Sequence, residues 1–359
     1  MNPVTMNPVT MSTEVINQSV INQTSAVVEV ATHSVFQHQH AAHCESGVIS
    51  SLLRHEGVAI SEAMAFGLSA ALSFAYLPFI KMGGMPLIAY RMPPRFIIKG
   101  LAKPLNATFA FETFSKPEAG KARLDELLAQ GKVVGLQSSV YWLPYFPEDM
   151  RFHFNGHNLL VYGREDDDYL ISDPVFETTV RCASADLQRA RFAKGALAPK
   201  GMLYYPKTIG NRSVQPEAVL GAIRKNCKIM LGPIPIVGIR GMRMLAKKIR
   251  KLAALSAETN AFVGHIIRMQ EEIGTGGAGF RFVYAAFLQE AAALTNRPRL
   301  AQLADELITI GDGWRAFALA TARMVKGRDP MNPGKLADLL LDRATAEAAF
   351  FVALRDAVK

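Results

Sequence analysis

The amino-acid sequence predicts an α+β protein, with strands and helices mixed in its first part and helices alone in its second. Up to about residue 206, short apolar runs alternate with turn residues, which is the pattern of buried strands. Beyond that point alanine and leucine dominate, β-branched residues thin out, and apolar positions recur at helical spacing. Half of the 359 residues are hydrophobic, enough for a sizeable core, and the length suggests about two domains.

The first 32 residues are predicted to be a disordered or adventitious tail. The segment MNPVT occurs twice in succession at the start, and VINQS is soon followed by VINQT. Short duplications rich in Asn, Thr and Ser are typical of chain ends that lie outside the fold. The first domain is therefore expected at residues 33–206 and the second at residues 207–359, with Pro206 and Gly210-Asn211 at the boundary.

Cap signals and apolar runs place the elements of the first domain. One helix opens at Cys44 and ends near Gly57, and Ser61 caps a second with Glu62 in its first turn. A third helix covers about 117–130, with Gly131 as its C-cap. Further apolar runs and expected strands lie at 72–79, 86–91, 95–98, 133–137, 141–146, 158–162 and 169–172, the last two joined in a hairpin by the acidic turn 163–168.

The second domain is predicted to contain only helices. Breaks fall at Gly232-Pro233, at the glycines after residue 273, at Arg297-Pro298 and at residues 330–333. The helices are expected at about 215–231, 239–273, 280–295, 299–325 and 334–356.

Cys44 is the candidate nucleophile. It stands just before an apolar-periodic run at 48–53, which predicts a helix with one buried face. At a helix N-terminus, the macrodipole and the free backbone N–H groups favour the thiolate, which is the nucleophilic form of cysteine. A Gln or His a few residues upstream can supply an oxyanion donor, so Gln39 and His38 are both candidates.

His157 and Asp173 are the candidate partners of the nucleophile. His157 precedes the first strand of the predicted hairpin and Asp173 follows the second, and such positions come close together in an antiparallel pair. The carboxylate can then set the imidazole tautomer. Alone, the histidine also suits a strand edge and the aspartate suits a turn before Pro174, but the predicted pairing favours a papain-like nucleophile site. Tyr141, Tyr145 and Asn158 are candidates for binding substrate.

A metal site is the main competing interpretation of the same region. His38, His40, His43 and Cys44 form a dense cluster of potential zinc ligands. Structural zinc sites usually draw a second ligand pair from elsewhere, and the sequence has no Cys-x-x-Cys partner. No metal is therefore expected.

The glycine-rich segment 274–279 resembles a phosphate-binding loop. It lacks the Gly-Lys-Ser/Thr ending of a P-loop and follows a helix instead of a strand, so a hinge between helices is favoured. In the helix that follows, Arg281 and Glu290 are charges on an otherwise apolar element. They are expected to pair with each other or to face the cleft as substrate-binding residues.

The net charge of +9 indicates an acidic partner. There is no dense Lys/Arg run with interleaved aromatics, so nucleic acid is not expected. The uncharged stretch 63–80 approaches the length of a membrane span, but Pro78 and its aromatic end favour a buried helix that runs into a strand. The amphipathic basic stretch Arg240–Lys251 either binds an anionic membrane or an acidic protein, or is a solvated helix face.

The cysteines point to a reducing compartment. Besides Cys44 there are only Cys182 and Cys227, an odd total at wide spacing, which argues against a disulfide framework. The N-terminus has no charged region followed by an apolar core, as a secretory signal would. A cytoplasmic location is expected, and Cys182 and Cys227 are interpreted as structural.

Several spaced motifs resemble the butirosin biosynthesis protein H family. One departure is Glu45, where a small residue, usually Gly, is expected; a carboxylate there would raise the pKa of the cysteine or repel an anionic substrate. The resemblance covers about residues 36–325, and its second part resembles the uncharacterised helical domain that commonly follows. The motifs are His43-Cys44-Glu45-Ser46, Ser61 to Gly67, Leu72 to Tyr76, Trp142 to Tyr145, Gly156-His157-Asn158, Ser172-Asp173-Pro174, Gly274 to Gly277 and Phe280 to Ala292.

The resemblance implies a papain-like, cysteine-peptidase-type first domain and an acyltransferase of secondary metabolism. The founding member of the family moves an amino-acyl group from an acyl carrier protein onto an amine of an aminoglycoside. Carried over, Cys44 is the nucleophile, His157 the base and Asp173 its orienter. The expected partners are an acidic acyl carrier protein, whose phosphopantetheine arm is part of the donor, and an amine-bearing small molecule. No bound cofactor is expected.

Two other functions remain open from the sequence. The same acyl-enzyme with water as acceptor would make a thioesterase or amide hydrolase, and a non-catalytic binding protein could keep the papain-like shell. The acyl group and the oligomeric state are not determined by the sequence, which is compatible with a homodimer.

Overall fold

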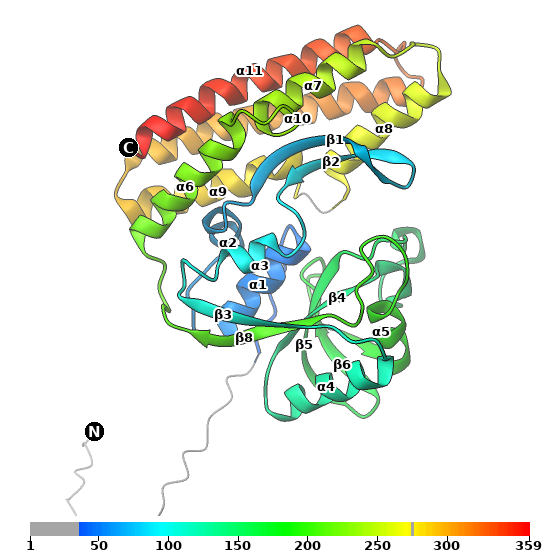
Figure 1. The fold of residues 1–359 in the computed structure, drawn as a ribbon, viewed down its shortest axis with the longest axis vertical. Coiled ribbons are helices and arrows are strands. Elements are labelled where there is room, and N and C mark those ends of the chain that lie inside the picture. Colours follow the sequence, from blue (N-terminus) through cyan, green and yellow to red (C-terminus); the bar gives the residue numbers. More distant parts are fainter. Residues whose placement is uncertain (1–35, 274–275) are drawn as a thin grey trace, which may run out of the picture. The chain divides into compact units, whose positions relative to one another are not determined.

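The computed structural model describes residues 36–273 and 276–359, and residues 35–359 form one compact unit (Figure 1). The predicted tail at residues 1–32 lies outside the described residues. The predicted boundary at residue 206 stays a prediction, because both predicted domains belong to this unit and strand β8 (Leu203–Ile209) runs across it. The α+β class, with a helical second part, is confirmed.

The first helices begin where the cap signals predicted. Helix α1 (Cys44–His55) starts at the candidate nucleophile. Helix α2 (Glu62–Leu68) is capped by Ser61, whose hydroxyl accepts a hydrogen bond from the backbone N–H of Met64. The uncharged stretch 63–80 is shared between α2 and the strand β1 (Leu72–Met82), as predicted, and no described helix is long and apolar enough to cross a membrane.

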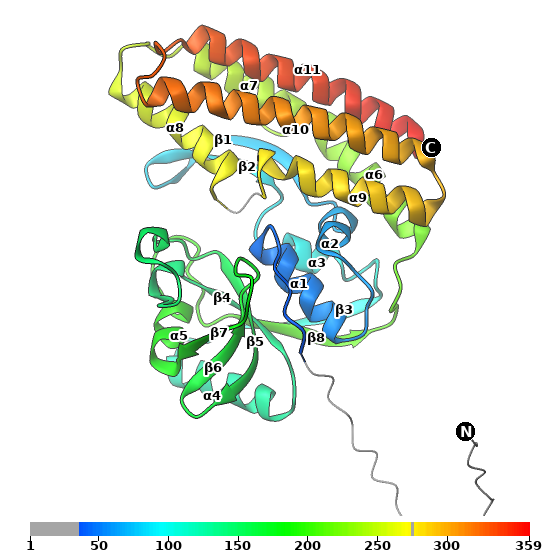
Figure 2. The same ribbon diagram turned by 180° about the vertical axis from the view of Figure 1, so that it is seen from behind.

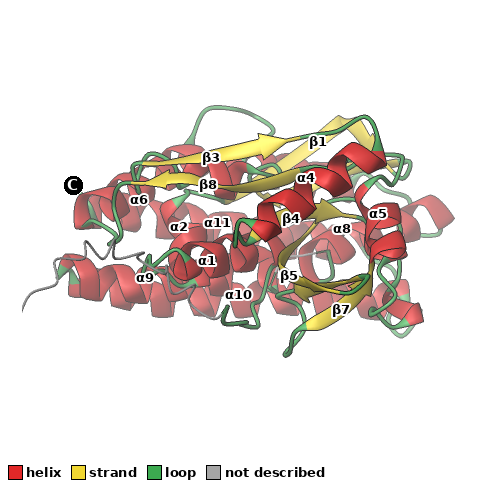
Figure 3. Cartoon of the chain, turned by 90° about the horizontal axis from the view of Figure 1, so that it is seen from below, coloured by secondary structure: helices red, strands yellow, loops and turns green. Residues whose placement is uncertain are grey.

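A six-stranded antiparallel sheet carries the His and Asp candidates. Helix α1 packs on one of its faces, and α4 (Pro117–Ala129) and α5 (Ser184–Arg191) pack on the other (Figure 3). Alternation along β5 explains this, because Leu159 and Val161 join the cluster under α4 and α5 while Leu160 joins the cluster with α1. The strand order is β3 (Ala107–Glu112), β8, β4 (Val134–Ser138), β5 (His157–Glu165), β6 (Asp168–Ser172) and β7 (Val180–Ala183).

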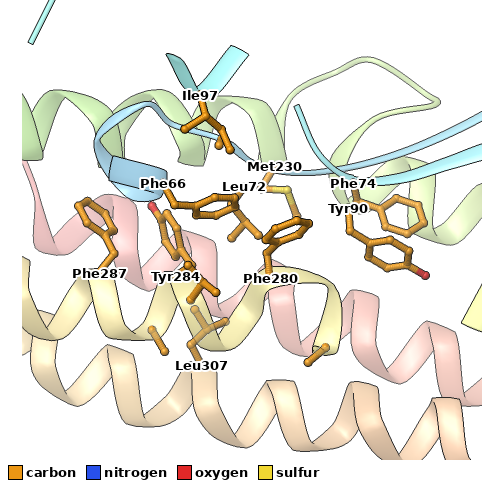
Figure 4. Close-up of a cluster of buried hydrophobic side chains, with 14 of the residues drawn as sticks. Phe66, Leu72, Phe74, Tyr90, Ile97, Met230, Phe280, Tyr284, Phe287 and Leu307 are labelled. Atoms are coloured by element: carbon orange, nitrogen blue, oxygen red, sulfur yellow. The ribbon is translucent and has the colours of Figure 1, made fainter. Parts of the chain in front are cut away.

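A separate hairpin of β1 and β2 (Met85–Arg91) lies along the helices of the second part (Figures 1 and 2). One face of it is aromatic and buried: Phe74 and Tyr90 meet edge to face, and both contact Trp314 of α10 (Figure 4). The short helix α3 (Phe96–Gly100) follows the hairpin in the chain. The helices of the second part are α6 (Pro216–Leu231), α7 (Gly238–Arg250), α8 (Ala257–Glu271), α9 (Arg281–Thr295), α10 (Pro298–Val325) and α11 (Pro333–Ala357).

Several element predictions were wrong or incomplete. Residues 141–146 form no strand; Val140–Trp142 is a short 3₁₀ helix, followed by a proline-containing turn. The helix expected at 239–273 is two helices, since Ser256 accepts a hydrogen bond from Thr259 N–H and starts α8 anew. Strands β3, β7 and β8 and helix α5 were not predicted, and the apolar run at 95–98 is the start of helix α3.

Candidate active site

The three predicted catalytic residues come together between α1 and the sheet. Cys44 is the first residue of α1 and 6% exposed, His157 is the first residue of β5, and Asp173 follows β6 directly. The His157 Nε2 lies 2.7 Å from the Asp173 Oδ2, which is the contact that the hairpin predicted. With Nε2 engaged in this way, Nδ1 is the ring nitrogen left for the thiol.

The charges of these groups favour a thiolate–imidazolium pair. Burial raises the pKa of the Cys44 thiol, but the electrostatic influence of His43 and His157 and hydrogen bonds from both rings outweigh it, so the pKa lies well below its usual value. Burial lowers the pKa of His157, whereas the Asp173 carboxylate and the Cys44 thiolate raise it, to about 10. The site is therefore built to hold a nucleophilic sulfur at neutral pH.

Asp173 is held by a third residue, Tyr145. Burial and the neighbouring carboxylate raise the pKa of Tyr145 well above its usual value, so its hydroxyl stays protonated. That hydroxyl donates to the Asp173 Oδ2 at 2.9 Å, and the Val175 N–H donates to Oδ1 at 3.3 Å. Tyr145, predicted to bind substrate, thus fixes the orientation of Asp173.

Of the two predicted oxyanion donors, His38 is already engaged, whereas Gln39 is exposed and stays a prediction. The His38 Nε2 donates to the Phe176 carbonyl at 3.0 Å, and its Nδ1 then accepts from the Ser172 hydroxyl at 2.8 Å. A neutral His38 therefore has no N–H left for an oxyanion.

Asn158 places a side-chain amide beside the candidate nucleophile. Its Nδ2 lies 4.0 Å from the Cys44 Sγ, and its Oδ1 accepts from the Tyr204 hydroxyl at 3.0 Å, which orients the amide. Together with the backbone N–H of Cys44 at the helix start, it can donate to an oxyanion formed beside the sulfur. Asn158 was predicted to bind substrate, and the structure places it next to the sulfur.

His43 is a functional residue that the sequence reasoning missed, since there it counted only as a potential metal ligand. It is the N-cap of α1, 1% exposed, and its Nδ1 accepts from the Ser46 backbone N–H at 3.2 Å. The same Nδ1 lies 2.9 Å from the Ser46 Oγ, whose hydroxyl donates to the Glu62 Oε1 at 2.8 Å. The ring also meets Phe280 edge to face at 5.0 Å. Hydrogen bonding between the His43 ring and Cys44 lowers the pKa of the thiol, so this residue acts on the nucleophile as well as on the helix start.

Replacing His43 with alanine should raise the pKa of Cys44, so the midpoint of the rate–pH profile for its alkylation by iodoacetamide should move to higher pH. It should also cost about 1 kcal/mol of stability through the lost cap. Ser61→Ala removes the cap of α2 instead and serves as the matched control, with a similar loss of stability but unchanged alkylation. An unchanged midpoint of the rate–pH profile in the His43 variant would show that the ring does not act on the sulfur.

Glu45, the departure from the family pattern, points away from the chemistry. Its side chain is fully buried; Oε1 accepts from the Ile97 N–H at 3.1 Å, and Oε2 lies 3.2 Å from the Arg91 Nη1. The carboxylate is therefore neutralised by Arg91 and joins α1 to α3. The causes that shift the pKa of Cys44 are burial, His43 and His157, and its net shift is downward.

Three other predicted substrate-binding residues lie away from Cys44. Tyr141 is 40% exposed and stacks on His153 in a surface depression. Arg281 is fully buried in an ion pair with Glu347, and Glu290 accepts from the hydroxyl of Ser61 at 2.7 Å. Arg281 and Glu290 neither pair with each other nor face the cleft. Each of these two charged side chains contacts a partner from another helix or helix cap within the protein.

The structure also describes most of three other features singled out in the sequence: the possible metal ligands, the glycine-rich segment and the two remaining cysteines. Among residues 36–273 and 276–359, no three His, Cys, Asp or Glu side chains gather where they could hold a metal ion. Gly274 and Thr275 lie outside the described residues, and the remaining part of that segment leads into α9. Burial raises the pKa of Cys182 and of Cys227 to about 12, and both thiols are free, in keeping with structural roles.

A cysteine that opens a helix, with a histidine and an aspartate presented by an adjacent antiparallel sheet, defines a papain-like cysteine enzyme. Residues 43–174 match the family model described as butirosin biosynthesis protein H, N-terminal, and residues 185–354 match a domain of unknown function (DUF4872). The chain belongs to the butirosin biosynthesis protein H-like family.

Two other comparisons give one distant structural match and no curated relative. A crystal structure described as a C39-like peptidase from Bacillus anthracis is similar with a TM-score of 0.33 and 13% identity, over 48% of this chain and 96% of that chain. No curated protein matches the chain.

Proposed function

We propose that this protein is a cysteine-dependent acyltransferase of secondary metabolism, which moves an acyl group from an acyl-carrier-protein thioester to an amine. The observation that carries the proposal is the placing of Cys44 at the start of α1 beside His157, whose ring is held by Asp173 at 2.7 Å; the lowered pKa of the thiol supports it. Such a sulfur attacks thioesters readily at neutral pH. Amide formation from a thioester is downhill, so the reaction needs no nucleotide.

In the first step, the Cys44 thiolate attacks the thioester carbonyl. The bond between the carbonyl carbon and the carrier sulfur breaks, and the carrier leaves as a thiol with the proton from His157. Asn158 and the Cys44 backbone N–H would stabilise the oxyanion of the tetrahedral intermediate. In the second step, the amine nitrogen attacks the acyl-Cys44 carbonyl and gives its proton to His157, while the Cys44 thiolate departs. The products are an amide and a free carrier thiol.

The charge of the surface supports an acidic carrier as partner. The exposed side of α7 carries Arg240, Arg243, Lys247 and Lys248, while its other side packs in the core through Met242 and similar residues. Together with the net charge of +9, these cations would attract an acidic carrier protein and speed its encounter. The phosphopantetheine arm belongs to the donor substrate in this proposal.

Intact-mass spectrometry with an acyl-carrier thioester tests the proposal. We expect an acyl adduct on Cys44 that persists in buffer and is released as an amide when an amine is added. Cys44→Ala should form no adduct, and Cys182→Ala, which removes a buried thiol elsewhere, should form it normally. Equal decay of the adduct with and without amine would identify a thioesterase or amide hydrolase, and no carrier unloading at all would identify a binding protein.

A further inference from the structure

Cys44 and His43 are among the residues that line a large, mostly apolar cavity. Its volume is about 650 Å³, within the roughly 300–1,000 Å³ usual for small-molecule sites. The sequence had an excess of apolar residues at 63–90 and 227–245, which core packing alone could explain. The structure divides them between the core and the walls of this cavity.

The β1–β2 hairpin contributes one wall of the cavity. Ala75 and Leu77 of β1 line it, opposite their register partners Ala89 and Leu87 of β2. Along β1 the lining residues alternate, and Tyr76 between them is buried on the other face of the hairpin; along β2, Ile88 lines the cavity as well. The paired alanines leave open the space that larger side chains would fill.

The helical part of the chain forms the facing wall. Ile229 comes from α6, Val237 from the segment before α7, and Met269 from α8. The hairpin is tied to this wall, because the Tyr76 N–H donates to the Ile236 carbonyl at 2.9 Å. The catalytic sheet alone therefore cannot make the cavity, which gives the second part of the chain a direct role at the site.

Three cations, Arg91, Lys225 and Lys228, stand among mostly apolar lining residues. The Arg91 Nη1 is used by Glu45 and by the Met92 carbonyl. The Lys225 ammonium lies 4.9 Å from the centroid of the Phe96 ring, and Lys228 is exposed. Against the apolar part of the lining, a chain with amides or charges would leave its polar groups unpaired, whereas a hydrocarbon chain would not.

We infer that this cavity holds the acyl chain of the Cys44 thioester, and that the acyl group is a long, apolar fatty-acyl chain. This inference rests on the proposed acyl transfer. It names the class of acyl donor, and it assigns to the helical part the wall that limits the length of the acyl chain.

The test compares acetyl, octanoyl and palmitoyl thioesters of N-acetylcysteamine, a small thiol that needs no carrier docking. The rate of adduct formation on Cys44 should rise roughly fourfold for each methylene that enters the cavity, until the chain fills it. In Ala89→Phe, a ring takes the place of the chain, so the ratio of palmitoyl to acetyl loading should fall at least tenfold. Ala349→Phe, the same change at an exposed position of α11, should keep the wild-type ratio.

Two outcomes would overturn the inference. Equal loading of all three thioesters by the wild-type protein would show that no chain pocket exists. An unchanged ratio in a folded Ala89→Phe protein, even with slower loading overall, would place the thiol arm or another group in the cavity. Ala89→Leu, a smaller change, repeats the comparison if the phenylalanine variant does not fold.

A binding measurement separates this inference from the proposed function. A fluorescent long-chain fatty acid should bind Cys44→Ala and be displaced by palmitate, and it should bind at least tenfold more weakly when Ala89→Phe is added. Binding without any acyl adduct in the wild-type protein would contradict the transferase but keep the pocket. Acyl adducts on the wild-type protein, without fatty-acid binding and without a preference for chain length, would keep the transferase but contradict the pocket.

Discussion

A His157→Ala variant should form the acyl-enzyme roughly 10⁴-fold more slowly than the wild-type protein, or worse. The substitution removes the proton donor for the leaving carrier thiol and the base for the amine. It also removes the cation that stabilises the Cys44 thiolate, so the pKa of the thiol should rise. Single-turnover loading, followed by intact mass, measures the first effect.

The pH dependence of alkylation by iodoacetamide measures the second effect without a substrate. In the wild-type protein the pKa of Cys44 is low, so its reaction should stay fast below the usual thiol range and slow only when acid protonates the sulfur. In His157→Ala the rate should rise only toward alkaline pH. His265→Ala, which removes a half-buried ring bonded to the Pro86 carbonyl, is the matched control and should alter neither measurement. A wild-type alkylation profile in His157→Ala would refute the ion pair.

Replacing Glu347 with alanine should destabilise the protein by about 3–5 kcal/mol. Glu347 and Arg281 are both fully buried, and the guanidinium donates from Nε to Oε1 at 2.8 Å and from Nη2 to Oε2 at 3.0 Å. The indole of Trp314 donates to the same carboxylate. Removing the carboxylate leaves a buried positive charge and an indole N–H without their acceptor. Urea unfolding followed by circular dichroism gives the loss.

Glu306→Ala is the matched control for this prediction. Glu306 forms an ion pair of similar length, 2.9 Å, with Arg299, but both side chains are about half exposed, so its loss should cost only about 0–1 kcal/mol. If Glu347→Ala does not fold, the double variant Arg281→Met with Glu347→Leu should recover stability, since no charge then stays buried alone. A cost for Glu347→Ala no larger than that of the control would be inconsistent with the buried pair.

The local elements and the nucleophile were predictable because their signals lie within a few residues. Cys44 opens α1, and Ser61 caps α2 as expected. The contact of His157 with Asp173 was predictable as well, since the two flank one hairpin and an antiparallel register leaves little choice. The separation of α7 from α8 was less visible, because a single serine cap ends a long helical pattern.

Residues whose roles depend on distant partners were assigned wrongly. Arg281 and Glu290 were expected at the cleft, as charges in an apolar helix, but their partners Glu347 and Ser61 are far away in sequence. Tyr145 was expected to bind substrate and instead holds Asp173. A charge or hydroxyl in the sequence shows that a partner is needed, and only the packing shows which one meets it.

The sequence by itself determined the fold class, the candidate triad and the family of this protein, because periodicity, caps and one short hairpin are local properties of the chain. The tertiary structure decided how Cys44 is surrounded: Asn158 beside its sulfur, His43 at its cap, and Glu45 turned toward Arg91. It also decided that the hairpin and the helices line a mostly apolar cavity together with Cys44. These features join segments up to some two hundred residues apart, and their geometry arises only when the core packs them against each other.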